Sequence, residues 1–371
     1  MKTFFNLIQE VQKPGLCHRC GGCVTFCTAV NYGALELNEE GIPRYGEIEK
    51  CIECGLCYTI CPEIDEMEEE TKRLVSWSAP IGRVVENSVA RARDPEIRNI
   101  GTDGGLVTAI LLHLFDTGKI DGAIVTRQIN RFQREPFLAL TREDIMESAG
   151  FHFDTSHGMK SFSDRYLTFS SIEELRPMMA KGLRRVAFVG TPCQIKSIRK
   201  MQALQIVPSE AISHCLGLFC SGNFVFGEQQ RQQLAEMGNF YWDNVSKINI
   251  KDDFQVHLQS GSIITIPLDK LDFMKREACR FCHDYSAEFA DLSFGGVGVE
   301  EGWTNVLART PLGRAVFADA RGKTVEEFSS SVGMRVASQA LERVLHWSEK
   351  KREMAVNNRE ELRSPSLKLK E

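Results

Sequence analysis

The chain has 371 residues, of which 43% are hydrophobic and 26% are charged, and its formal net charge is −5. This is the composition of an ordinary globular protein with one large or two unequal domains. The negative charge and the lack of a long basic block argue against a nucleic-acid partner. No apolar run approaches the roughly 20 residues of a membrane helix, and the N-terminus lacks a signal-peptide pattern. We therefore expect a cytoplasmic protein without a membrane span of its own.

The thirteen cysteines are the most informative part of the composition. Eight of them lie in the first 61 residues, and none lies between Cys61 and Cys193. Such crowding has little use in a disulfide-stabilised protein, whereas it is typical of a metal-binding one. The distribution therefore predicts a metal protein.

The N-terminal cysteines form two copies of the motif C-x2-C-x2-C-x3-C. The copies are Cys17, Cys20, Cys23 and Cys27, and then Cys51, Cys54, Cys57 and Cys61, with Pro62 following. In two-cluster ferredoxins, three cysteines of such a run bind one [4Fe–4S] cluster and the fourth binds the other cluster. We therefore assign one cluster to Cys17, Cys20, Cys23 and Cys61, and the other to Cys51, Cys54, Cys57 and Cys27.

This pattern resembles clostridial-type ferredoxins over about residues 10–65, and we predict a ferredoxin-like domain at residues 1–62. Gly21, Gly22 and Gly55 suit loops where the backbone must approach sulfide closely. One departure is Thr28, which follows Cys27 where the second copy has proline. The alternative is a pair of four-cysteine zinc sites, but the tandem spacing favours iron–sulfur clusters.

The segment after Pro62 changes character. Residues 63–81 carry a dense acidic run, EIDEMEEETKR, and end in SWSAP. We interpret this segment as a solvated acidic linker or helix between two domains.

Residues 82–335 alternate between strand and helix patterns, which predicts a larger mixed α/β domain. The expected strands are 87–93, 122–126, 185–190 and 211–219, and the expected helices are 106–115, 173–180 and 195–204. Residues 245–267 alternate in the manner of a small antiparallel meander. The C-terminal part, 336–371, contains an amphipathic helix pattern at 337–355, and we expect its last ten residues to be frayed.

Three short motifs in this body carry chemistry. Gly104 and Gly105 open the apolar helix 106–115, and the N–H groups of such a helix start suit a phosphate, although ordinary helix initiation explains the pair equally well. Cys193 follows Pro192 in a first helical turn, where a thiol has a lowered pKa and can bind metal or act as a nucleophile. Cys279 and Cys282 form a C-x2-C pair, which suits zinc, a redox dithiol or half of a cluster.

Five cysteines remain outside the N-terminal motifs, and a third cubane needs four. Cys215 lies inside the apolar run 211–219, where a buried inert thiol is the ordinary interpretation. Cys220 ends that run beside Ser221 and Gly222, where the backbone can turn around a cluster. We therefore assign a third [4Fe–4S] cluster to Cys193, Cys220, Cys279 and Cys282. The alternatives are zinc on the same four ligands or a redox switch at Cys193.

The order of motifs in the body resembles the β-subunit family of coenzyme F420-reducing hydrogenases and dehydrogenases. The matching segments are DGGLVTA (103–109), IDGAIV (120–125), FVGTPCQI (188–195), GLFC-SGNF (217–224), CRFCHDYSAEFADLSFGGVG (279–298) and GWTNVLARTPLG (302–313). They extend over nearly all of residues 82–320. With a ferredoxin segment ahead, the layout most resembles the input subunit of F420H2 dehydrogenases, and also the N-terminal part of F420-dependent sulfite reductase.

The resemblance implies that the body is a flavin-binding domain with FAD and a [4Fe–4S] cluster, over which coenzyme F420 docks. The residues expected at the flavin pocket are Thr102, Asp103, Gly104, Gly105, Thr108, Ser161, Arg165, Lys196 and Trp303. It also implies an oxidoreductase that moves hydride between F420 and FAD and passes single electrons through three [4Fe–4S] clusters to a partner subunit. A deazaflavin carries hydride and a cubane carries one electron, so a flavin must stand between them. No side chain need act as a nucleophile.

Two other functions remain open at this point. One is a ferredoxin-dependent flavin reductase of an organic substrate, and the other is a non-catalytic electron-relay subunit. A nicotinamide donor is disfavoured, because no G-x-G-x-x-G fingerprint follows an expected strand.

Overall fold

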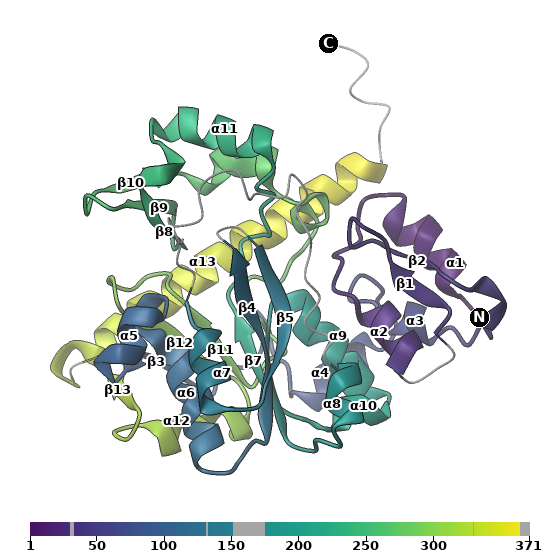
Figure 1. Ribbon diagram of the computed structural model, residues 1–371, viewed down its shortest axis with the longest axis horizontal. Coiled ribbons are helices and arrows are strands. Elements are labelled where there is room, and N and C mark those ends of the chain that lie inside the picture. Colours follow the sequence, from purple (N-terminus) through teal and green to yellow (C-terminus); the bar gives the residue numbers. More distant parts are fainter. Residues whose placement is uncertain (30–32, 131–132, 151–174, 329, 364–371) are drawn as a thin grey trace.

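The computed structural model describes residues 1–29, 33–130, 133–150, 175–328 and 330–363. Figure 1 shows a small N-terminal domain beside a larger α/β domain, and the long helix α13 (Ser330–Arg363) runs across the larger domain toward the smaller one. A ferredoxin-like domain followed by a mixed α/β domain is the architecture expected from the sequence. None of the described helices is both long enough and apolar enough to cross a membrane.

The N-terminal domain is built around its cysteines. Its elements are α1 (Phe4–Leu7), α2 (Gly22–Ala29), α3 (Leu56–Thr59) and the antiparallel hairpin of β1 (Leu35–Leu37) and β2 (Pro43–Tyr45). Each cysteine motif leads into a helix, the first into α2 and the second into α3. The small apolar core, which includes Phe4, Leu7 and Tyr58, packs directly against cysteines of both motifs.

The larger domain centres on an eight-stranded mixed sheet in the order β13-β3-β12-β11-β7-β6-β4-β5. The strands are β3 (Glu86–Ala92), β4 (Gly122–Asn130), β5 (Gln133–Ala139), β6 (Val186–Gly190), β7 (Ile212–Leu218), β11 (Leu292–Gly295), β12 (Thr304–Ala308) and β13 (Val325–Glu327). The pairs β4–β6, β6–β7 and β7–β11 are parallel, and the outer pairs are antiparallel.

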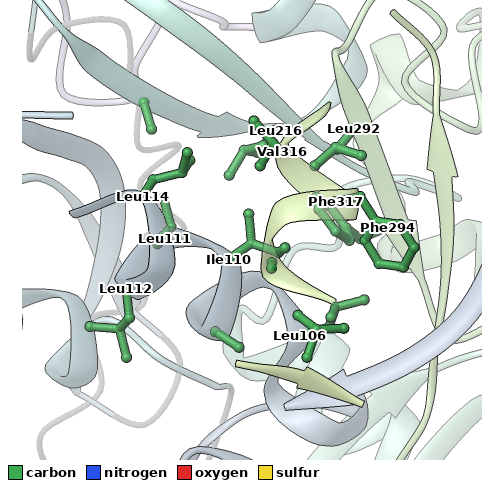
Figure 2. Close-up of a cluster of buried hydrophobic side chains, with 14 of the residues drawn as sticks. Leu106, Ile110, Leu111, Leu112, Leu114, Leu216, Leu292, Phe294, Val316 and Phe317 are labelled. Carbon is green, nitrogen blue, oxygen red and sulfur yellow. The ribbon is translucent and has the colours of Figure 1, made fainter. Parts of the chain in front are cut away.

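Helices cover both faces of this sheet. One face packs against α5 (Pro95–Ile100), α6 (Leu106–Asp116), α7 (Arg142–Glu147) and α12 (Pro311–Ala320). Figure 2 shows Ile110 of α6 and Phe317 of α12 packed with Phe294 of β11 in this layer. The other face packs against α8 (Leu175–Ala180) and α9 (Pro192–Ala203), with α10 (Val207–Glu210) beside them. The alternation along β4 shows the two layers, because Ala123 and Val125 belong to the first core and Ile124 to the second.

The ends of two neighbouring parallel strands position the body cysteines. β6 and β7 pair in parallel, and they end at Gly190 and Leu218. Their carboxyl ends therefore meet at the same edge of the sheet, which is the edge where open α/β sheets bind ligands. Cys193 and Cys220 follow these two ends by a few residues.

A second, smaller sheet forms a separate layer. It consists of the antiparallel strands β8 (Val245–Ile250), β9 (Phe254–Leu258) and β10 (Ile263–Ile266), and it packs with α11 (Glu228–Gly238) around its own core. This is the antiparallel meander expected at residues 245–267.

The segment after Pro62 differs from expectation. α4 (Glu68–Leu74) does form there, but it is not a solvated connector, because it packs along α9. Thr71 and Val75 are buried, while Glu69 and Glu70 face solvent. The run of acidic residues gave no indication that one side of this segment is buried.

Helix α13 is longer than the expected 337–355, since it covers 330–363. The sequence analysis did not predict strands β5, β11, β12 and β13 of the larger domain, or the hairpin of β1 and β2. The last eight residues, expected to be frayed, lie outside the described residues.

Candidate functional site

Four cysteines surround a cavity in the N-terminal domain, and we call them the distal group: Cys27, Cys51, Cys54 and Cys57. The cavity is also lined by Phe4, Phe26 and Leu35. Burial, followed by the charges of Cys54, Cys27 and Cys51, raises the pKa of the Cys57 thiol to about 12. The fourth cysteine of the first motif thus lies with three cysteines of the second motif, which is the crossed arrangement expected from the spacing.

The remaining N-terminal cysteines form a second set, the proximal group: Cys17, Cys20, Cys23 and Cys61. Burial raises the pKa of Cys20 to about 11. Burial also raises the pKa of Cys23 far above its ordinary value, and the charges of Cys20, Cys17 and Cys61 add to this effect. Here the fourth cysteine of the second motif lies with three cysteines of the first.

The body group consists of Cys193, Cys220, Cys279 and Cys282, brought together from three parts of the chain. Cys193 stands in the first turn of α9, where its thiol lies 3.3 Å from the hydroxyl of Thr191. Burial raises the pKa of Cys193 well above its ordinary value, and the charges of Cys20, Cys282 and Cys220 add to the rise. The lowered pKa expected for a thiol in a first helical turn is therefore wrong, because burial outweighs the helix start. Burial also raises the pKa of Cys282 to about 12, with smaller contributions from Cys279 and Cys220.

Cys215 lies apart from this group. It is fully buried in β7, and burial raises the pKa of its thiol to about 12. The charges acting on it are those of Arg199 and Asp291 rather than of other cysteines. The structure therefore brings Cys220, and not Cys215, to the other three body cysteines.

The donor sets fit iron–sulfur clusters chemically. All three groups consist of thiols in buried surroundings, and such thiols become thiolates when they bind metal. The described residues contain no site for a single metal ion, which would need at least three converging histidine, cysteine or acidic side chains.

The three groups follow one another in space. Gly22, between Cys20 and Cys23, lies against Ser197 of α9, one turn beyond Cys193, so the body group neighbours the proximal group. The proximal Cys23 in turn feels the charge of Cys57 in the distal group. The order is therefore body, proximal and distal.

The N-terminal domain docks on α9 and on the loop before Cys279 through buried contacts. Phe26 and Ile60 pack into the same apolar cluster as Ile195 and Ile198 of α9. Lys200, which is fully buried, donates to the carbonyl oxygens of Cys61 (2.8 Å) and Ile64. These contacts hold the domain in one position relative to the body cysteines.

Two further charged contacts close this interface. Arg276 donates to the carbonyl oxygen of His18 at 2.8 Å, and this bond is buried. Glu63 pairs with His18 at 2.5 Å and with Arg359 of α13 at 2.6 Å. Burial alone would raise the pKa of Glu63, but His18 and Arg359 lower it to about 2. A buried charge paired on two sides favours one defined geometry of docking.

Lys351 is a site residue that the sequence reasoning missed. Its ammonium donates to the carbonyl oxygens of Cys220 (2.5 Å) and Asp284 (2.9 Å), and the residue is only 7% exposed. Burial alone would lower the pKa of Lys351, but Cys282, Cys220 and Cys279 raise it above its ordinary value. The sequence could have indicated this role through position alone. Lys351 lies on the buried side of α13, together with Val344, Ser348 and Ala355.

The residues expected around the flavin lie in two places. Thr102, Asp103, Gly104, Gly105 and Thr108 belong to the start of α6, and Trp303 follows Gly302, which abuts Gly104. Lys196 lies on α9, at the other face of the sheet, where it pairs with Glu68 at 2.7 Å. Ser161 and Arg165 lie outside the described residues.

The glycine pair has a packing role that requires no ligand. Both glycines have positive φ values, +81° and +69°. A β-carbon on Gly104 would lie 2.2 Å from the carbonyl oxygen of Gly302, and one on Gly105 would lie 2.4 Å from that of Ile97. Only glycine suits both the backbone conformation and these close approaches.

The polar groups of this loop are engaged by the protein itself. Asp103 accepts a hydrogen bond from the Asn249 amide at 2.8 Å and lies 3.5 Å from the Lys251 ammonium. Trp303 stacks under the Arg91 guanidinium, 4.2 Å from its ring centre. The described residues do not by themselves assemble one flavin pocket, so their flavin contacts stay a prediction.

Comparison with known proteins follows the same division of the chain. Residues 183–332 match the C-terminal family model of the coenzyme F420 hydrogenase/dehydrogenase beta subunit, and residues 88–163 match the N-terminal model of the same family. Residues 9–62 match the 4Fe–4S dicluster domain model.

Two curated relatives and one solved structure extend this comparison. The beta subunit of coenzyme F420 hydrogenase from Methanosarcina barkeri is 29% identical, over 75% of this chain and 95% of its own length. An F(420)H(2) dehydrogenase subunit of Methanosarcina mazei is 26% identical, over 90% and 91%. A chain of the F420-reducing [NiFe] hydrogenase complex from Methanosarcina barkeri superposes with a TM-score of 0.66 at 27% identity, covering 78% of this chain and 96% of that one. The chain therefore belongs to the coenzyme F420 hydrogenase/dehydrogenase beta subunit family and carries a dicluster domain at its N-terminus.

Proposed function

We propose that this beta-type iron–sulfur subunit couples hydride transfer between coenzyme F420 and FAD to one-electron transfer through three [4Fe–4S] clusters. The body, proximal and distal groups would hold one cluster each, and electrons would pass between the distal cluster and another redox subunit. The observation that supports this most is the spatial order of the three cysteine groups. The proximal loop at Gly22 lies against Ser197 of α9, the helix that carries Cys193, and Cys23 and Cys57 belong to one apolar cluster.

When bound, FAD would supply the exchange between two-electron hydride chemistry and one-electron transfer, which neither F420 nor a cubane supplies. The chain's own residues would hold and space the clusters. The twelve thiols bind them, while Lys200 and Arg276 fix the N-terminal domain against the body. Lys351 places a positive charge beside the body group, where it stabilises added electrons.

A dye assay on anaerobically purified protein tests the proposal. F420H2 should reduce benzyl viologen, whereas NADH and NADPH should do so poorly. Removal of the flavin should abolish this activity, and added FAD should restore it, because each cubane accepts only one electron. Turnover with NADH and none with F420H2 would refute the F420 assignment.

The same preparation separates catalysis from simple relay. A non-catalytic relay subunit would contain its full iron but no flavin, and F420H2 would leave the dye oxidised. A reductase with its own organic substrate would reduce that substrate without F420.

A further inference from the structure

The two cysteine motifs form equivalent loops in the N-terminal domain, and among the described residues the larger domain covers only the first of them. In the proximal loop, His18 and Arg19 stand between Cys17 and Cys20; in the distal loop, Ile52 and Glu53 stand between Cys51 and Cys54. The loops share their backbone conformation, since Arg19 and Glu53 have positive φ values of +52° and +56°. They are therefore repeats of one structural unit.

The proximal loop serves as a docking surface within the chain. His18 is 7% exposed, and its carbonyl oxygen accepts a hydrogen bond from Arg276 of the larger domain. Lys200 approaches the same cysteine group through the carbonyl oxygen of Cys61. The covering domain thus presents cations to backbone carbonyls and apolar side chains to Phe26 and Ile60.

The distal loop has the same shape but faces solvent. Ile52 is 57% exposed, and Ile48, in the short turn before Cys51, is 62% exposed. Two large aliphatic side chains beside one loop are thus exposed in the described structure, and we call this pair the apolar centre. The loop also lines the distal cysteine cavity, through Lys50, Ile52 and Glu53.

Acidic residues flank both isoleucines of this apolar centre along the chain. Glu47, Glu49 and Glu53 are exposed, and the one cation within residues 47–53, Lys50, pairs with Glu47 at 2.5 Å. Three carboxylates against one ammonium leave the patch negative. An apolar centre with a charged rim is the anatomy of a transient protein interface, and the rim steers the partner.

We propose that residues 47–53 form the docking surface for a one-electron redox protein whose own contact face has a small apolar centre ringed by lysine and arginine. This deepens the proposed function by naming the surface at the distal cluster, and it rests on that function only in requiring a cluster at the distal group. Docking there brings the partner against the loop that holds Cys51 and Cys54. One electron leaves the reduced cluster and one acceptor centre is reduced, with no proton transferred.

The test uses the full holoprotein with its clusters reduced by dithionite, which is then removed by gel filtration. Oxidised cytochrome c, a basic haem protein, is the probe in stopped-flow mixing, where each electron converts one ferric haem to ferrous. Because dithionite replaces F420H2, a failure of the F420 assignment leaves this measurement intact.

The variant Glu47→Gln/Glu49→Gln/Glu53→Gln should reduce cytochrome c about 10-fold more slowly at low ionic strength and lose most of its salt dependence. A matched control, Glu143→Gln/Glu147→Gln/Glu236→Gln, removes three exposed carboxylates from α7 and α11 and should behave as wild type. Ile52→Ser should slow the reaction at high salt as well, because its contribution is not screened. The variant Glu47→Lys/Glu49→Lys leaves the loop between Cys51 and Cys54 unchanged, so it replaces the triple variant in this test if the triple variant loses iron.

Equal rates and equal salt dependence in wild type and the triple variant would overturn the proposal. Equal slowing by the control triple would overturn it too, since the effect would then come from overall charge. Faster reduction of an acidic flavodoxin than of cytochrome c by the wild type would also contradict it.

Discussion

Gly22 in α2 faces Ser197 in α9 so closely that a β-carbon on Gly22 would lie 2.2 Å from the Ser197 hydroxyl oxygen. Gly22 stands between Cys20 and Cys23 of the proximal group, and Ser197 lies one turn beyond Cys193 of the body group. This contact brings the backbone around one cysteine group against the helix that carries a cysteine of the next. While serine stands at position 197, this close contact therefore favours glycine at position 22.

Gly22→Ala should weaken the docking of the N-terminal domain. The added methyl group overpacks the interface, which costs about 1–3 kcal/mol. Thermal unfolding of the holoprotein should therefore begin at a lower temperature, with iron content unchanged. Ser197→Ala alone should be close to wild type, and the double variant should recover most of the loss, because the nearest remaining atom is the Ser197 β-carbon at 3.4 Å. Additive effects of the two substitutions would show that this contact does not limit docking.

Iron analysis should separate Cys215 from Cys220. Three cubanes correspond to about twelve iron atoms per chain. Cys220→Ser should reduce the count to about eight, because Cys220 lies with Cys279 and Cys282. Cys215→Ser should retain about twelve and cost only about 1–3 kcal/mol of stability for a buried hydroxyl. The reverse result would place Cys215 in the body cluster, and stoichiometric zinc with about eight iron atoms would replace that cluster by a zinc site.

Lys351→Met should lower the midpoint potential of the body cluster. The methionine fills similar space but removes a buried positive charge that stabilises the reduced cluster, so reduction becomes harder. We expect a fall on the order of 60 mV, about a tenfold change in the equilibrium constant for one electron. A redox titration followed by electron paramagnetic resonance measures it. Lys350→Met is the matched control, because Lys350 lies over the Trp347 ring, 4.7 Å from its centre, instead of beside the cysteines. Equal potentials in wild type and Lys351→Met would refute the electrostatic role.

Glu288→Gln should change how stability depends on pH. Burial, followed by the nearby Asp284, raises the pKa of Glu288 to about 7 despite the contact with Arg352. A folded-state pKa above the unfolded value of 4.5 contributes stability that is present below pH 4.5 and lost as pH rises through 7. Glutamine cannot ionise and still accepts the hydrogen bond from Trp77. The variant should therefore gain in melting temperature relative to wild type as pH rises from about 4.5 to about 7, measured on both holoproteins. Parallel curves would mean that Glu288 keeps one protonation state over this range.

The cysteine framework of the N-terminal domain could be predicted because the information for it is local. Two cysteine motifs of fixed spacing specify a helix after each loop, and the geometry of the loop sends Cys27 and Cys61 to the opposite groups. The preference for Cys220 over Cys215 also followed from position, since one stands at a strand end and the other in the strand interior.

Long-range contacts could not be read in this way. Lys351 reaches the body group from a helix that begins more than a hundred residues after Cys220, and its position on a buried stripe was the only signal. β12 was not predicted because all five of its residues are buried, so its sequence lacks the alternation of polar and apolar residues that marks a strand. The glycine pair was ambiguous, because a phosphate and a neighbouring backbone both require the same small residue; the structure shows the backbone of Gly302 there.

Anaerobic titration of the holoprotein with F420H2 tests the proposed electron path most directly. Oxidised F420 should appear in the absorbance spectrum while signals of reduced clusters appear in both domains, and NADH should produce neither change. In Cys220→Ser, F420H2 should no longer reduce the clusters of the N-terminal domain, because the body cluster connects them to the flavin. Cluster reduction by NADH but not by F420H2, or full reduction of the N-terminal clusters in Cys220→Ser, would contradict this path.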